Sequence, residues 1–236
     1  MAELDIPGFL LWYFGFLFSI TLHEAAHAWA ALRGGDPTAY LGGQVTMNPL
    51  PHIRREPLGT VLVPLVTFFS RGWMMGWASA PYDSLWAGRY PRRAAAMAAA
   101  GPAANLIIAA AVFLLLKLLL QAGIVAVPWP PSFTRLVVPA TPGGPPWIDG
   151  ACQLASILLN LNLIFVCFNL LPVPPMDGYG IVSGLLRERF GGIFRLVEAN
   201  PMVALLGLFA AWTIFPWIFF PILRRVIRLL YAGVPI

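Results

Sequence analysis

The sequence predicts an all-α polytopic membrane protein with about four full transmembrane helices, further re-entrant or short segments and a small membrane-associated β element. Charged residues make up only 11% of the 236 residues, against about 25% in soluble domains, and the mean hydropathy is +0.76. Four apolar runs are also long enough to cross about 30 Å of hydrocarbon. This composition excludes a disordered chain, a disulfide-rich secreted scaffold and an ordinary water-soluble domain.

The predicted spans cover residues 9–32, 94–120, 151–171 and 203–223. The first run does not have the character of a secretory signal, because its leader carries Glu3 and Asp5 where such leaders are basic. We expect one integral-membrane domain over residues 1–236, with a catalytic core at about 9–190 and a C-terminal helical segment at about 203–230.

Shorter elements are expected between and after these spans. The apolar run 58–69 is interrupted by Pro64 and is too short to span comfortably, so it is predicted to be re-entrant, peripheral or one half of a crossing pair. Short extended pieces are predicted at 41–47 and at 74–79, and a short amphipathic helix at 181–190.

The positive charges mark the ends of the apolar runs. The net charge is +5, and 14 of the 15 basic residues are arginines, without a basic face interleaved with aromatic residues. This distribution is typical of topology signals rather than of a nucleic-acid surface, so we expect a lipid bilayer and no nucleic acid as partner.

A possible metal site lies inside the first predicted span. His23 and His27 stand at i and i+4 on one helical face, where both imidazoles can bind one tetrahedral metal ion, and Glu24 beside them can act on a water at that ion. Polar groups of this kind are costly in hydrocarbon unless they are used. The alternative is a chance pattern or a polar packing cluster, and the spacing favours the metal.

A catalytic zinc ion needs a third protein ligand. Asp177 is the stronger candidate, because it follows the end of a span broken by three prolines, and irregular backbone at membrane depth must be buried in protein or line a wet cavity. Asp177 could instead only cap the next helix. His52, beside two arginines in a loop, is the weaker candidate.

The chain resembles the site-2 proteases, the family of intramembrane zinc metalloproteases, in their compact prokaryotic form. Three motifs carry the resemblance, which extends from about residue 9 to residue 190: His23-Glu-Ala-Ala-His27, Gly101-Pro-Ala-Ala-Asn105 and Asn169-x-x-Pro-x-Pro-x-x-Asp177-Gly178. The chain departs from the family pattern at 52–56 and at Ser79, outside the metal motifs.

The resemblance implies residue roles and a substrate class. His23, His27 and Asp177 would bind one zinc ion, Glu24 would be the general base for attack of a zinc-bound water, and Asn169 would help to bind the substrate carbonyl or the oxyanion. The substrate would be a transmembrane protein or peptide.

Two further groups of residues are candidates for substrate binding. Gln44, Val45 and Thr46 lie in the predicted strand 41–47, whose edge could hold an unwound substrate by strand addition. The same strand could merely plug the mouth of the site. Asn105 is a polar residue on an apolar helix, and its partner could be the backbone or the active site.

The metal ligands also constrain the topology. His27 lies near the end of the first span and Asp177 just past the end of the 151–171 span, so both spans must end at the same membrane face. Residues 34–93 then begin and end at that face. Ten of the fifteen basic residues are expected at that face, and an excess of arginine marks the cytoplasmic side. These ten are Arg33, Arg54, Arg55, Arg71, Arg89, Arg92, Arg93, Arg187, Arg189 and Arg195.

The active site is therefore expected towards the cytoplasm in a prokaryotic inner or plasma membrane, with the N-terminus outside. The side of the C-terminus stays open. A rival function is a zinc-binding membrane scaffold or carrier without proteolytic activity, although transport would normally need further ligands along a path.

Overall fold

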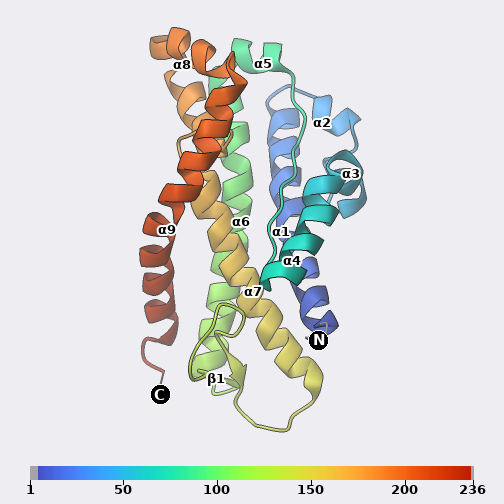
Figure 1. Ribbon diagram of the computed structural model, residues 1–236, viewed down its shortest axis with the longest axis vertical. Coiled ribbons are helices and arrows are strands. Elements are labelled where there is room, and N and C mark those ends of the chain that lie inside the picture. Colours follow the sequence, from blue (N-terminus) through green and yellow to red (C-terminus); the bar gives the residue numbers. More distant parts are fainter. Residues whose placement is uncertain (1–4, 235–236) are drawn as a thin grey trace.

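The computed structural model describes residues 5–234. Within them, four helices are long and apolar enough to cross a membrane: α1 (Ile6–Arg33), α6 (Pro91–Gln121), α7 (Pro146–Asn169) and α9 (Pro201–Tyr231). They stand side by side in Figure 1, where α1 and α7 run upward and α6 and α9 run downward. The predicted fold class is confirmed. We call the end of the bundle where α1 finishes the upper end, and the opposite end the lower end.

Each of the four long helices has a proline in its first turn: Pro7, Pro91, Pro146 and Pro201. Proline suits this position because its fixed φ favours the helix and the missing N–H would have no helical partner there. Side chains cap the N-termini of two of these helices. The carboxylate of Asp5 accepts a 2.8 Å hydrogen bond from the Gly8 amide, and Asn200 caps α9.

The chain makes an excursion between α1 and α6. The short helices α2 (Thr38–Leu41) and α3 (Pro49–Arg55) lead into the π-helix η1 (Leu58–Leu62) and α4 (Val63–Arg71). In Figure 1, α4 descends beside α1, and an extended segment returns to the upper end, where α5 (Ser84–Arg89) precedes α6. The excursion thus begins and ends at one end, and 58–71 is its descending, helical half.

The depth of this excursion corrects the end of the bundle at which Arg71 was expected. The rings of Phe68 and Phe69 lie 5.5 and 5.3 Å from that of Phe9 in the first turn of α1. Arg71 therefore belongs to the lower end and not to the upper end. Nine arginines remain at the upper end, against six basic residues at the lower end.

The predicted β element exists, but in a different place. A two-stranded antiparallel sheet pairs β1 (Val125–Ala126) with β2 (Val138–Pro139) in the loop between α6 and α7. The strand expected at 41–47 is absent from the described chain: α2 ends at Gly42 and Gly43, and the Gln44 amide bonds back to the Ala39 carbonyl at 2.9 Å. The backbone groups that a strand would use are satisfied locally.

The segment expected to form a strand at 74–79 is extended but is not paired as a strand within residues 5–234. One backbone bond, from the Trp77 amide to the Gly59 carbonyl at 3.1 Å, holds it to η1. Gly59 allows this approach, because a Cβ there would overlap the Trp77 carbonyl.

The prolines between Leu171 and Met176 end α7 as predicted, and α8 (Asp177–Glu198) follows. It is longer than the helix expected at 181–190 and is kinked at Phe190. A Cβ at Gly178 would lie 2.5 Å from the Leu171 carbonyl oxygen, so glycine lets the first turn of α8 pack against the end of α7. Asp177 is thereby fixed at the first position of α8.

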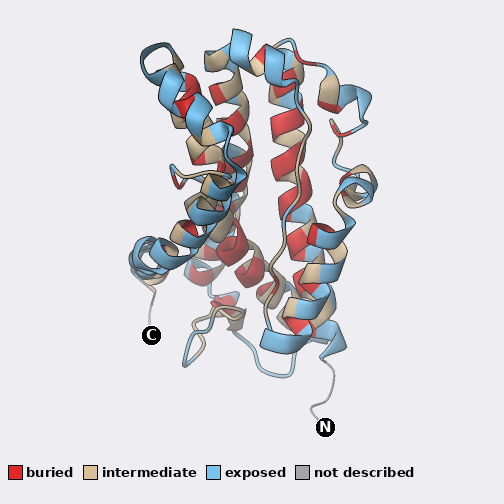
Figure 2. Cartoon of the chain, turned by 45° about the horizontal axis from the view of Figure 1, so that its top comes forward, coloured by how far each residue is buried: buried red, intermediate tan, exposed pale blue. Residues whose placement is uncertain are grey.

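The core follows the helix interfaces. One cluster packs α1, α4 and α7 around Phe16, Phe68 and Ile157, and a second packs α6, α7, α9 and the small sheet around Leu116 and Leu136. Figure 2 shows the buried residues along the middle of the bundle and the exposed ones on its outer faces. Half of the most apolar stretch of α7 but only 17% of that of α9 is buried, so α9 is the least buried of the four long helices.

Candidate metal centre

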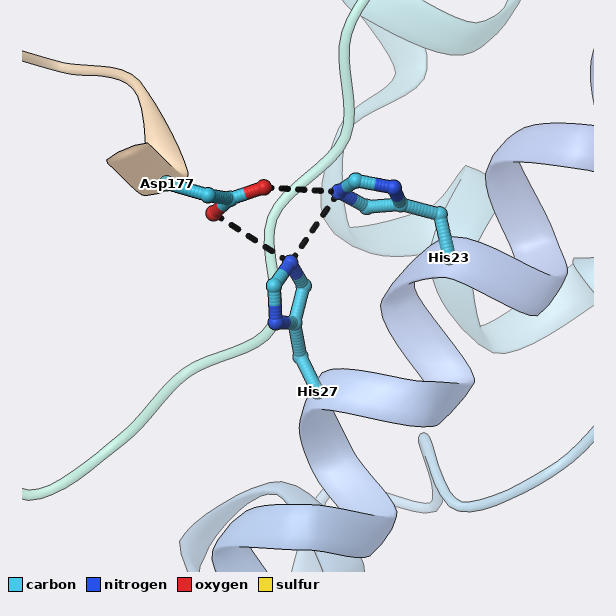
Figure 3. A group of neighbouring side chains, drawn as sticks. All are labelled: His23, His27 and Asp177. Carbon is cyan, nitrogen blue, oxygen red and sulfur yellow. Dashed lines mark hydrogen bonds and ion pairs between the residues drawn. The ribbon is translucent and has the colours of Figure 1, made fainter. Parts of the chain in front are cut away.

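His23, His27 and Asp177 come together from α1 and the start of α8, and Figure 3 shows their side chains pointing toward one another. The Asp177 oxygens lie 3.1 Å from His23 Nε2 and 3.3 Å from His27 Nε2, and the two Nε2 atoms are 3.0 Å apart. These distances fit one small cation, because two ligands at ~2.0–2.1 Å from a tetrahedral zinc ion are ~3.3 Å apart.

The outer nitrogens of both histidines are held by acceptors. His27 Nδ1 lies 2.7 Å from the Met97 carbonyl oxygen, and His23 Nδ1 lies 2.5 Å from Asn105 Oδ1. Since these oxygens can only accept, each Nδ1 carries the proton and each neutral imidazole presents the Nε2 lone pair inward. Two lone pairs and a carboxylate that face one another are stable only around a positive charge. The residues therefore fit a bound zinc ion.

Asp177 supplies the negative charge of the group. Its two carboxyl oxygens face the Nε2 atoms of the histidines at 3.1 and 3.3 Å, and a carboxylate is the form that binds a cation.

Gly101 of α6 borders the ligand group. A Cβ at this position would lie 2.6 Å from His23 Nε2 and would overlap His27 Nε2. Glycine is needed here because any side chain would occupy the space of the two imidazoles. The place of Gly101 opposite the ligand atoms could not be found from sequence.

Glu24 and Asn169, the predicted catalytic residues, lie on the two helices that lead to the ligands. Glu24 follows His23 on α1, is 5% exposed and is not part of the ligand group. Asn169 is the half-buried last residue of α7, eight positions before Asp177. Their catalytic roles stay predictions.

The predicted substrate-binding residues of the loop divide into two groups. Gln44 is buried, and its Nε2 donates a 3.4 Å hydrogen bond to the Ser79 carbonyl, which ties the loop to the extended segment. Val45 and Thr46 line an open apolar groove of about 320 Å³ beside α1, together with Trp29 and Ala104.

Asn105 lies behind His23, and none of its surface is exposed. Its Nδ2 donates to the Ser19 carbonyl and to Asn162 Oδ1, so the polar atoms of its side chain are all bonded within the bundle. These contacts favour a role in positioning His23, and substrate binding by Asn105 stays a prediction.

Ser19, Asn162 and the Met97 carbonyl contribute to the site and were missed from sequence. A signal existed for Asn162, because an amide inside an apolar span must find a polar partner. His52, the weaker ligand candidate, is not in the ligand group; its Nε2 donates to the Thr46 carbonyl at 3.3 Å.

The four apolar helices and the His-Glu-x-x-His ligand group together define a membrane metalloprotease, and comparison with known proteins agrees. The model of the peptidase family M50 matches residues 11–213. A Bacillus subtilis (strain 168) protein named "Putative zinc metalloprotease YwhC" is 31% identical over 191 residues, which are 81% of this chain and 76% of that protein. A Mycobacterium tuberculosis (H37Rv) protein named "Putative zinc metalloprotease Rip2" is 28% identical over 87% of this chain and 68% of its own length. No solved structure matches the chain.

The chain belongs to peptidase family M50, the site-2 protease family. It is a zinc metalloprotease of this family, with candidate membrane-spanning helices, and its substrates are proteins.

Proposed function

We propose that the protein hydrolyses peptide bonds of transmembrane substrates within or near the bilayer, as in regulated intramembrane proteolysis. The observation that carries the proposal is the ligand group His23, His27 and Asp177 inside a bundle of apolar helices. At ~1.5 Å per residue, His27 lies ~9 Å and His23 ~15 Å below the end of α1 at Arg33. A substrate bond must therefore enter the bundle to reach the ligands.

The candidate site residues have different roles in this hydrolysis. His23, His27 and Asp177 would hold one zinc ion, which would supply Lewis acidity and make water acidic enough to lose a proton near neutral pH. Glu24 takes that proton as general base and later gives a proton to the leaving amine. Asn169 donates a hydrogen bond to the substrate carbonyl, where negative charge develops.

Substrate must reach this site in an extended form, because a helix engages its own carbonyls. Val45 and Thr46 would contact the unwound segment from the groove beside α1, and Gln44 keeps their loop attached to the extended segment through Ser79. With the upper end in the cytoplasm, the substrate would be cut towards the cytoplasmic side of a prokaryotic inner or plasma membrane.

The test separates zinc binding from catalysis. The purified protein is loaded with zinc in detergent or vesicles and assayed against a transmembrane peptide. We expect Glu24→Gln to bind one zinc ion per chain as the wild type does but to cleave at least about 100-fold more slowly, because general-base catalysis contributes about that much. We expect Asp177→Ala and His23→Ala to lose zinc as well as activity.

Glu188→Gln is the matched control, since this glutamate is exposed on α8 and its side chain is 72% accessible. Cleavage by Glu24→Gln at the wild-type rate would show that Glu24 is not the base. Unchanged zinc content in Asp177→Ala would refute the ligand set. A zinc-loaded wild type that cuts no transmembrane peptide would favour the scaffold or carrier without proteolytic activity.

A further inference from the structure

A chain of buried amide groups lies behind His23. Asn105 of α6, Asn162 of α7 and Ser19 of α1 are each 0% exposed. Asn105 Nδ2 donates to Asn162 Oδ1 at 2.7 Å and to the Ser19 carbonyl at 3.2 Å. Asn162 Nδ2 donates to Ser19 Oγ and to the Leu158 carbonyl, both at 2.8 Å. Three helices thus meet at one polar network that ends on a metal ligand.

The orientation of each amide in this network is fixed, because two of its acceptors are backbone carbonyls, and carbonyls can only accept. The Leu158 carbonyl requires an N–H from Asn162, which turns Asn162 Oδ1 toward Asn105. The Ser19 carbonyl and Asn162 Oδ1 together then require both N–H groups of Asn105. The Asn105 oxygen is left to face His23 Nδ1.

We propose that Asn162 is a positioning residue of the metal centre, which fixes the Asn105 amide and through it the tautomer of His23. With Asn105 Oδ1 toward the ring, the proton of His23 stays on Nδ1 and the Nε2 lone pair points at the metal. If the Asn105 amide turned over, its N–H would demand the lone pair of Nδ1. The proton would move to Nε2, and His23 would no longer be a ligand.

This proposal rests on the proposed function only in that His23 binds zinc. Partners that orient a metal-binding histidine contribute about 10- to 100-fold to metal affinity. In Asn162→Leu, Asn105 loses one of its two acceptors, and we expect zinc to bind about tenfold more weakly. Affinity is measured by competition with a chelator, and the His23 tautomer by NMR of the ¹⁵N-labelled imidazole.

Asn160→Leu is the matched control. Asn160 is a second fully buried asparagine on α7, but it bonds to the Phe133 carbonyl at 2.5 Å, away from His23. Both leucine variants should lose stability, and only Asn162→Leu should lose zinc affinity and the Nδ1–H signature. In the buried Asn162→Asp, the protonated carboxyl can donate to the Leu158 carbonyl and keep its other oxygen toward Asn105, so this variant should restore most of the affinity.

Zinc affinity within twofold of the wild type in Asn162→Leu, with an unchanged His23 signature, would overturn the proposal. If that variant does not fold, Ser19→Ala decides: it removes one bond of Asn162 and should weaken zinc binding about threefold, whereas no change in affinity or tautomer refutes the proposal. A wild type that binds zinc but cuts no transmembrane peptide would refute the proposed function and leave this inference standing.

Discussion

At the scale of single residues, the metal centre depends on what is missing as much as on what is present. Gly101 faces both imidazoles, and the absence of a Cβ leaves room for the Nε2 atoms of His23 and His27 to converge. The adjacent Pro102 lies inside α6 and has no backbone N–H, so the helix lacks one hydrogen bond near the ligands.

We therefore predict that Gly101→Ala loses zinc. The added methyl group would displace at least one imidazole, and the affinity should fall by at least about tenfold, as when a histidine ligand loses its orientation. Zinc content after dialysis against a weak chelator measures the effect.

Gly192→Ala provides the comparison, because a Cβ at Gly192 in α8 meets nothing within 4 Å. Alanine there should keep full zinc content and stabilise the helix by up to about 1 kcal/mol. Equal zinc content in both alanine variants would show that Gly101 does not border the ion.

At the scale of elements, α9 is hydrogen-bonded to the rest of the bundle near its C-terminus. The ammonium group of Lys117 on α6 donates to the carbonyls of Leu229 and Leu230 at 3.1 and 3.0 Å and also to that of Ala232. The Tyr231 hydroxyl donates to the Leu136 carbonyl at 2.8 Å. The last carbonyls of a helix lack helical donors, so a lysine there satisfies them and complements the helix dipole.

We predict that Lys117→Met, which keeps an apolar stem, lowers the free energy of unfolding by about 1.5–3 kcal/mol, the range for hydrogen bonds to a charged group. Amide exchange in residues 225–233 should become faster, while exchange in α1 should not change. Exchange read by mass spectrometry in detergent tests this.

Arg225→Met removes an exposed positive charge from the same end of α9 and should leave that exchange pattern unchanged. Equal exchange in the two methionine variants would mean that Lys117 does not hold the helix.

The elements also show where prediction from sequence failed. The long spans were predicted because about twenty apolar residues must form a helix in hydrocarbon, whatever surrounds them. The prediction of a strand at 41–47 was wrong, because Gly42 and Gly43 end α2 with local hydrogen bonds. The pattern of side chains along the sequence does not show such backbone bonds. The true sheet has only two residues in each strand, which is too short for any pattern.

At the scale of the whole molecule, the four long helices and the excursion between α1 and α6 place both described ends of the chain at the lower end (Figure 1). This resolves the side of the C-terminus relative to the N-terminus, because α9 runs on through Pro216 and Pro221 without turning back. The six basic residues at the lower end weaken the charge argument for orientation, but nine arginines still favour the upper end as cytoplasmic.

We predict that both termini lie on the side of the membrane opposite the cytoplasm. A C-terminal alkaline phosphatase fusion should be active and a C-terminal fluorescent-protein fusion dark. Cysteine introduced at the exposed Arg189 of α8 should react with an impermeant maleimide only from the cytoplasmic side. A fluorescent C-terminal fusion would reverse the orientation and place the active site outside.

The sequence by itself predicted the membrane class, the four spans, the candidate ligands on α1 and Asp177 as the candidate third ligand. Length, hydropathy, the i, i+4 spacing and the prolines before Asp177 are all local features of the chain. Only the tertiary structure decided what surrounds these ligands. Gly101, Asn105 and Asn162 meet His23 and His27 from other helices, and such contacts arise from helix packing between distant segments, which leaves no period or spacing in the sequence.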